Sequence, residues 1–157
     1  MKLLIVCLGN ICRSPMAEGI MRKKINEKKL PIEVDSAGTA DYHIGDSPDE
    51  RAIYTARSYG VDISNLRGRQ FSIKDFDRFD RIYAMDSSNH KNILRIARHD
   101  QDRNKVYYFF TDGKNGLDVP DPWFGDLEGF YPVYELLDRA GEKILLEIME
   151  EVKGIKS

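Results

Sequence analysis

The chain lacks the cysteine content of secreted scaffolds and the long apolar runs of membrane proteins. It contains two cysteines in 157 residues, Cys7 and Cys12. A disulfide-stabilised secreted domain would spread more cysteines along its length, so we expect a reducing, cytoplasmic location. The longest apolar run, Leu3 to Leu8, ends at Gly9 and is too short for a membrane span or a secretory signal. We therefore expect neither a disulfide scaffold nor a membrane partner.

An excess of charge of one sign is also missing. Lys and Arg number 24 and Asp and Glu 26, which gives a formal net charge of −2. Proteins that bind a nucleic-acid backbone usually concentrate basic residues, so we expect no nucleic-acid partner, and any phosphate recognition must be local. Hydrophobic residues make up 41% and charged residues 32% of the chain, a balance typical of soluble globular proteins. No Gly-, Ser- or Pro-rich linker divides residues 1–157, which predicts a single domain.

Apolar runs alternate with helical patterns along the chain. We expect strands at residues 3–6, at 32–34 with an end at 36–38, at 81–85 and at 106–110. We expect helices from 14–15, from 47–48 to 60, from about 88 to 98 and over an apolar stripe from 133 to 152, with a long loop at 113–126. Such alternation predicts an α/β fold, a parallel sheet with helices on both faces. Ligands bind these sheets beyond the carboxyl ends of strands, where the loop after the first strand begins.

That first loop has the composition of a phosphate-binding loop. Its successive backbone N–H groups can surround a phosphate dianion, helped by the positive end of the following helix. Gly9 and Asn10 are residue types that tolerate left-handed backbone angles in a tight curl. Arg13 carries a planar fork that can bind two phosphate oxygens. The predicted phosphate-binding residues are Leu8, Gly9, Asn10, Ile11, Cys12, Arg13 and Ser14.

Cys7 stands at the base of this loop and is the predicted nucleophile. Thiols near helix N-termini and cationic groups ionise readily, and Ser14 can donate a hydrogen bond to the sulfur. The thiolate would attack phosphorus to form a phosphocysteine that water hydrolyses, without a metal or other cofactor because Arg13 and the amides neutralise the phosphate. The alternatives are weaker: a zinc site lacks ligands, and a Walker loop would end in Gly-Lys-Ser/Thr. For Cys12, simple packing as a small apolar thiol is as good an interpretation as a role in binding phosphate.

A second loop supplies the predicted acid and the pocket walls. A phenolic leaving oxygen, with a pKa of about 10, needs a proton donor. Asp121 lies between two prolines that stiffen its loop, and we predict that it is this donor rather than an ordinary turn aspartate. Trp123, Phe124 and Tyr42 are candidate walls for an aromatic ring, with partial core burial as the alternative for Phe124. The three histidines, His43, His90 and His99, are expected on the solvated surface.

The string from Val6 to Pro15 resembles the N-terminal signature of the low-molecular-weight protein tyrosine phosphatases. The resemblance continues through residues 35–38, 84–86 and 119–122, and so covers nearly the whole chain. It implies a three-layer sandwich around a four-stranded parallel sheet of order 2-1-3-4, with Cys7, Arg13 and Asp121 as catalytic residues. It also implies that Asn10 braces the loop through side-chain hydrogen bonds.

The same resemblance suggests partners and regulation. It implies phosphotyrosine-containing protein substrates, a cognate tyrosine kinase as in bacterial members, and a monomer or weak self-association. Members often carry two phosphorylatable tyrosines after Asp-Pro, whereas Trp123 and Phe124 have no hydroxyl, so that form of control is not expected. Asp86 is expected either to support the loop or to cap the next helix.

Three other functions agree less well with the sequence. Arsenate reductases of similar sequence use further cysteines, and none follows Cys12. Phosphoarginine phosphatases of the same family tend to have threonine where this chain has Ile11, which makes phosphoarginine the second candidate substrate. A non-catalytic phosphate-binding module would need neither Cys7 nor Asp121.

Overall fold

Four parallel strands form the central sheet of the chain. The structure, a computed structural model, describes residues 1–156. The strands are β1 (Lys2–Cys7), β2 (Glu33–Gly38), β3 (Arg81–Ala84) and β4 (Val106–Tyr108), hydrogen-bonded in the order β2-β1-β3-β4. All three pairings are parallel, which confirms the α/β sheet and the strand order expected from the sequence. The central strand β1 is buried from its second residue onward because both faces of the sheet are covered.

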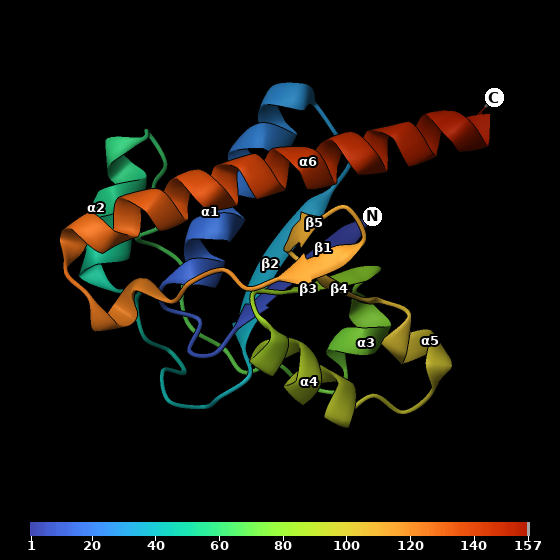
Figure 1. Ribbon diagram of the computed structural model, residues 1–157, viewed down its shortest axis with the longest axis horizontal. Helices are drawn as coiled ribbons and strands as arrows, with labels where there is room; N and C mark the ends of the chain where they lie inside the picture. Colours follow the sequence, from blue (N-terminus) through green and yellow to red (C-terminus); the bar gives the residue numbers. More distant parts are fainter. Residues whose placement is uncertain (157) are drawn as a thin grey trace.

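Helices cover the sheet on its two faces (Figure 1). One layer contains α1 (Arg13–Lys28), α2 (Glu50–Ser58) and the long α6 (Phe130–Lys156). The opposite layer contains α3 (Asp75–Arg78), α4 (Ser87–Arg95) and α5 (Asp100–Arg103). Helix α6 lies across α1 and the sheet, and its C-terminal end extends past them (Figure 1). This is the three-layer arrangement that the sequence predicts.

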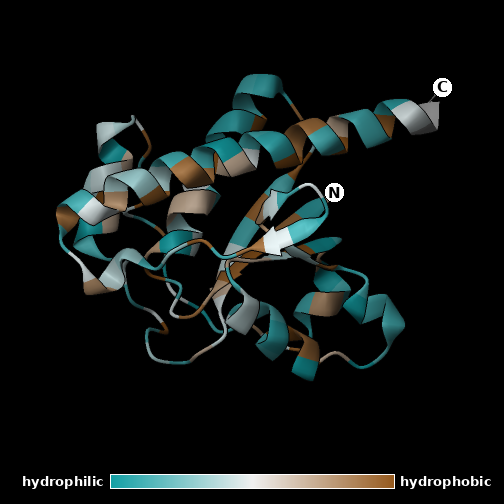
Figure 2. Ribbon diagram, viewed as in Figure 1, coloured by the Kyte–Doolittle hydropathy of each residue, from teal (hydrophilic) through white to brown (hydrophobic). Residues whose placement is uncertain are grey.

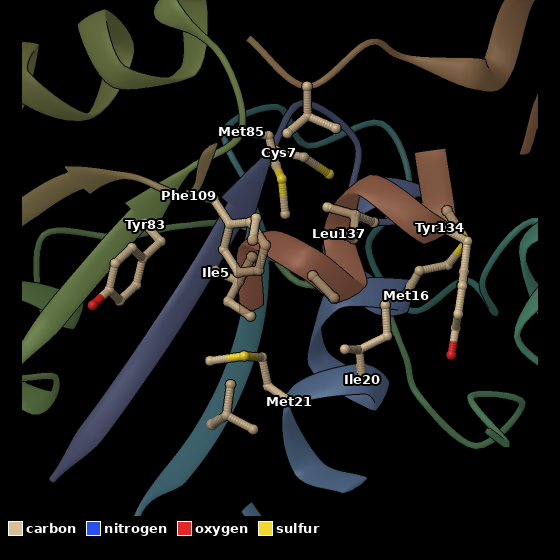
Figure 3. Packing of buried hydrophobic residues seen from close by; sticks show 14 of the residues in the cluster. Ile5, Cys7, Met16, Ile20, Met21, Tyr83, Met85, Phe109, Tyr134 and Leu137 are labelled. Carbon is tan, nitrogen blue, oxygen red and sulfur yellow. The ribbon is translucent and has the colours of Figure 1, made fainter. Parts of the chain in front are cut away.

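Alternate residues of β1 point into two separate hydrophobic clusters. Leu3 and Ile5 belong to the larger one, which lies between the sheet and α1, α2 and α6. Leu4 and Val6 belong to the smaller one under α3 and α4. Figure 3 shows the larger cluster, with Cys7 at its edge where β1 ends. Figure 2 shows that the helices around the sheet carry both hydrophilic and hydrophobic residues.

The chain after β4 differs from the predicted pattern. The expected strand at 106–110 leaves the sheet after Tyr108, and residues 110–112 (β5, Phe110–Asp112) pair antiparallel with β6 (Asn115–Leu117) inside the expected loop. Gly113 makes the turn with a positive φ of 60°. At Gly116 the Tyr108 ring occupies the space of a Cβ, so only glycine fits. These three-residue strands are too short for a periodic signal.

The helix boundaries also shift. Helix α2 begins at Glu50 and not at 47–48, because the Asp49 side chain caps it by accepting a hydrogen bond from the Arg51 N–H at 2.8 Å. Gly60, with φ of 79°, follows its end as expected. Two short 3-10 helices, η1 (Pro122–Phe124) and η2 (Leu127–Gly129), precede α6. Among the described residues, no helix has the length and apolar character needed to cross a membrane.

Candidate active site

The loop between β1 and α1 curls at the carboxyl end of the sheet. Asn10 has a left-handed φ of 58°, as its residue type predicted, whereas Gly9 does not. Gly9 instead allows the His43 ring to approach the loop closely, since a Cβ at Gly9 would lie 3.1 Å from the His43 Cδ2 atom. The neighbouring chain holds the loop from outside, because Ala40 donates its N–H to the Leu8 carbonyl at 3.0 Å.

A pocket of about 230 Å³ opens above this loop. Every predicted site residue except Asn10 and Ser14 lines it, including the three proposed wall residues. His43, which we expected on the solvated surface, lines it as well, and its Nδ1 lies 3.1 Å from the Asp46 Oδ2. The structure therefore brings together two loops that are more than a hundred residues apart in the sequence.

The Cys7 sulfur is buried and contacts two polar groups of its own loop. The Asn10 N–H donates to Sγ at 3.3 Å, and the Ser14 Oγ lies 3.0 Å from Sγ. Only 3% of Cys7 is exposed. Both groups can donate a hydrogen bond to the sulfur and so hold it at the base of the loop.

A chain of hydrogen bonds determines which way the Ser14 hydroxyl points. The Ser36 hydroxyl donates to the Glu18 carboxylate at 2.6 Å, and therefore accepts from the Asn10 Nδ2 at 3.0 Å. The same Nδ2 donates to the Ser14 Oγ at 2.8 Å. Ser14 accepts this bond, which leaves its own proton available for donation to the Cys7 sulfur.

The Asn10 amide is itself held in one orientation. Its Oδ1 accepts the Arg69 backbone N–H at 3.0 Å, so Nδ2 faces the two hydroxyl groups. At the far end, burial raises the pKa of Glu18, while Ser36 and an ion pair with Arg22 oppose that shift. Asn10 thus has the bracing contacts that the resemblance implied. Ser36 was missed as a partner because it comes from β2, and Glu18 of α1 because it is connected to Asn10 only through Ser36.

Arg13 is buried and is held from two sides. Its Nη1 donates to the Asp86 Oδ2 at 2.7 Å and to the Val119 carbonyl at 2.9 Å. Burial alone would lower its pKa, but Cys7 and Asp86 raise the pKa of Arg13 overall, so it stays a cation. Asp86 also accepts the Asn89 N–H through Oδ1 at 2.7 Å and caps α4. Both expected roles of Asp86, supporting the loop and capping the helix, are therefore present.

Asp121 lines the same pocket, beside Arg13. Its Oδ2 is 3.7 Å from the Arg13 Nη2, and its Oδ1 accepts the Trp123 N–H at 3.1 Å. The Asp121 side chain is 31% exposed, so a bound ester can reach it. The alternative interpretation of Phe124, partial burial in the core, is wrong: the residue is 85% exposed at the rim, with its ring edge-on to Trp123.

Cys12 packs as a small apolar thiol, which is one of the two interpretations that the sequence allows. It is buried in the larger hydrophobic cluster and also lines the pocket. Burial and the nearby Asp49 carboxylate raise the pKa of the Cys12 thiol far above its ordinary value, which keeps the thiol neutral. Within residues 1–156, no three His, Cys, Asp or Glu side chains are grouped so that they could hold a metal ion.

Comparison with known proteins identifies the family. The family described as low molecular weight phosphotyrosine protein phosphatase matches residues 2–154. The chain belongs to this family. It is 39% identical to the low molecular weight phosphotyrosine protein phosphatase of Saccharomyces cerevisiae over 132 residues, which cover 80% of this chain and 81% of the relative. As a member, the chain is a cysteine-based phosphatase and a hydrolase.

Solved structures of tyrosine phosphatases share the whole fold. The protein tyrosine phosphatase of Entamoeba histolytica, solved with Hepes in its active site, superposes with a TM-score of 0.89 at 37% identity, over 96% of this chain and 98% of that one. Vibrio vulnificus Wzb, solved with benzylphosphonate, gives a TM-score of 0.82 at 31% identity, over 93% and 97% of the two chains. The phosphatase family therefore accounts for both the sheet order and the first loop.

Proposed function

We propose that this phosphatase hydrolyses aryl phosphomonoesters, with phosphotyrosine in proteins as the physiological class. Cys7 is the proposed nucleophile, Arg13 and the amides of residues 8–14 bind the phosphate, and Asp121 is the general acid. The observation that carries the proposal is the pocket itself, which is lined both by a sulfur in contact with two groups able to donate hydrogen bonds and by a partly exposed carboxyl group.

The proposed reaction has two steps. In the first, the Cys7 thiolate attacks phosphorus, the bond from phosphorus to the ester oxygen breaks, and Asp121 gives its proton to the departing phenol. In the second, the Asp121 carboxylate takes a proton from water as the water oxygen attacks phosphorus. The bond between sulfur and phosphorus then breaks and inorganic phosphate leaves. The Arg13 cation and the backbone amides stabilise the charge of the transferring group in both steps.

The walls of the pocket favour an aromatic substrate. Tyr42, Trp123 and Phe124 form a largely apolar mouth above the phosphate loop, and aromatic side chains contact flat rings favourably. Wzb, which shares this fold, was solved with benzylphosphonate, a phenyl ring joined to a phosphonate through one CH2 group. Phosphoarginine remains the second candidate; the bulky Ile11 at the pocket wall favours phosphotyrosine over it.

Turnover of p-nitrophenyl phosphate in the presence of a metal chelator tests the proposal. Cys7→Ser should abolish hydrolysis while inorganic phosphate still binds, as measured by calorimetry. Asp121→Asn should lower kcat/KM for phenyl phosphate by about 100-fold or more, and much less for 2,4-dinitrophenyl phosphate, whose phenol leaves without a proton. Hydrolysis that survives Cys7→Ser, or that stops with the chelator, would refute this mechanism. Parallel assays on phosphotyrosine, phosphoserine and phosphoarginine peptides decide the substrate class.

A further inference from the structure

The loop that carries Asp121 is held in place by Arg51 of helix α2. The Arg51 Nη1 donates to the Gly125 carbonyl at 2.6 Å, and its Nη2 donates to the Trp123 carbonyl at 3.1 Å. Its guanidinium also lies 4.7 Å from the centre of the Phe130 ring, where α6 begins. Arg51 thus binds two carbonyl groups of the segment 121–125, which we call the acid loop.

The other hydrogen bonds of the acid loop lie within the loop itself. Within the described part of the chain, the other hydrogen bonds of residues 121–125 are internal, from Trp123 to Asp121 and from Gly125 to Pro122. The side chains of Trp123 and Phe124 are 45% and 85% exposed, so they pack little against the rest of the fold. The direction of the Asp121 carboxyl group therefore depends on the two bonds from Arg51, together with its own ion pair with Arg13 at 3.7 Å and the packing of the buried Pro122.

Arg51 is in turn fixed to the phosphate loop through Asp49. The Asp49 carboxylate accepts from the Arg51 Nε and Nη2, both at 2.9 Å, in a two-point pair. The Asp49 backbone N–H donates to the Ile11 carbonyl at 2.8 Å. A continuous series of bonds thus runs from the phosphate loop through Asp49 and Arg51 to the acid loop, and it spans the two sides of the pocket.

We propose that Arg51 is a positioning residue that holds the Asp121 carboxyl group in line with the Cys7 sulfur. This inference rests on the proposed function, because it assumes that Asp121 is the general acid. An arginine is required because its planar fork serves Asp49 and both carbonyl groups at once, whereas a lysine ammonium is a single point of charge. An ordinary surface ion pair would affect stability slightly and chemistry not at all.

The test compares leaving groups in Arg51 variants. Arg51→Met keeps the apolar stem but removes the fork, and Arg51→Lys keeps only the charge. Both should lower kcat/KM for phenyl phosphate by roughly 10- to 100-fold, since a small misplacement of a catalytic group has an effect of that size. For 2,4-dinitrophenyl phosphate, and for inhibition by inorganic phosphate, the change should stay within about threefold. Arg57→Met, at an exposed arginine of the same helix, is the matched control and should behave as wild type.

A double variant separates this inference from the proposed function. Because Arg51 acts through Asp121, Asp121→Asn combined with Arg51→Met should hydrolyse phenyl phosphate no more slowly than Asp121→Asn alone. If Asp121→Asn itself shows no leaving-group effect, the proposed function fails. If it does, but the Arg51 variants slow both esters equally or their effects add to that of Asp121→Asn, the positioning role is refuted. Circular dichroism melting confirms that each variant is folded at the assay temperature.

Discussion

Gly38 shows how closely the phosphate loop packs on its neighbour. This residue ends β2 beside Cys7, with which it is paired in the sheet. A Cβ at Gly38 would lie 2.8 Å from the Leu8 carbonyl oxygen and 3.2 Å from the Asn10 nitrogen, both of them backbone atoms. The φ of Gly38 is not positive, so its role is to leave space and not to adopt an unusual conformation. The shape of the phosphate loop therefore depends on a missing side chain in another strand.

Replacing Gly38 by alanine tests this dependence. The added methyl group should push the loop backbone outward and lower kcat/KM for p-nitrophenyl phosphate by about 10-fold or more, because the amides would no longer converge on the phosphate. Gly129→Ala is the control, since a Cβ there meets nothing within 4 Å. Steady-state kinetics on both variants provide the measurement, and wild-type kcat/KM in Gly38→Ala would contradict the argument.

At the scale of elements, the packing of α1 against α6 helps to position the phosphate loop, because α1 follows directly after it. Helix α1 begins with Arg13 and is fixed by the larger hydrophobic cluster. Leu137 of α6 is fully buried there, and Figure 3 places it with Met16 and Ile20 of α1. Helix α6 is long and mixed in polarity, with Leu146 about half exposed on its outer side. Its inner face therefore provides most of the stabilisation.

Leu137→Ala should destabilise the protein by about 2–5 kcal/mol, because it removes buried apolar surface and leaves a cavity. Leu146→Ala on the same helix should change the free energy of unfolding by about 0.5 kcal/mol or less, since this side chain is 47% exposed. Urea unfolding followed by circular dichroism measures both values. Equal effects of the two substitutions would mean that the inner face of α6 does not carry the stability.

At the scale of the whole molecule, carboxylates with lowered pKa values are spread over both helical layers. The Arg98 guanidinium and backbone N–H hydrogen-bond Asp102 and lower its pKa far below the ordinary value, and Arg51 lowers the pKa of Asp49. A carboxyl group whose pKa is lower in the folded state stabilises the fold above its unfolded pKa of about 4. That contribution is lost as the pH falls toward the folded value. Glu18, with its raised pKa, acts in the opposite direction, because its burial costs stability at neutral pH.

The melting temperature should therefore change little from neutral pH down to about pH 5 and fall below about pH 4. Asp102→Asn should lower the melting temperature at pH 7. It should also flatten the fall of the melting temperature between pH 5 and pH 3, since the variant lacks the carboxyl group whose pKa is lowered in the folded state. Thermal melts followed by circular dichroism across this range measure both curves. Parallel curves for the wild type and the variant would show that Asp102 contributes no pH dependence.

Much of the site could be predicted because its central part is contiguous. Cys7, Asn10, Arg13 and Ser14 lie within one short segment between an apolar strand and a proline-marked helix start, so their chemistry is visible in the order of residues. Asp121 was predicted from a stiff Pro-Asp-Pro segment, and the structure places it at the same pocket. The short helices α3 and α5 and the β5–β6 hairpin were missed, because segments of three or four residues show no periodicity.

The sequence by itself determined the α/β class, the phosphate loop and the identity of its proposed nucleophile, because each depends on residues that are neighbours along the chain. Only the tertiary structure decided which groups from distant parts of the chain contact that loop or line its pocket. Ser36, Arg51 and His43 come from separate segments, and nothing in their local sequence indicates the site. Packing of those segments against the carboxyl end of β1 brings them to it, and contacts between residues far apart in the chain are a property of the folded molecule.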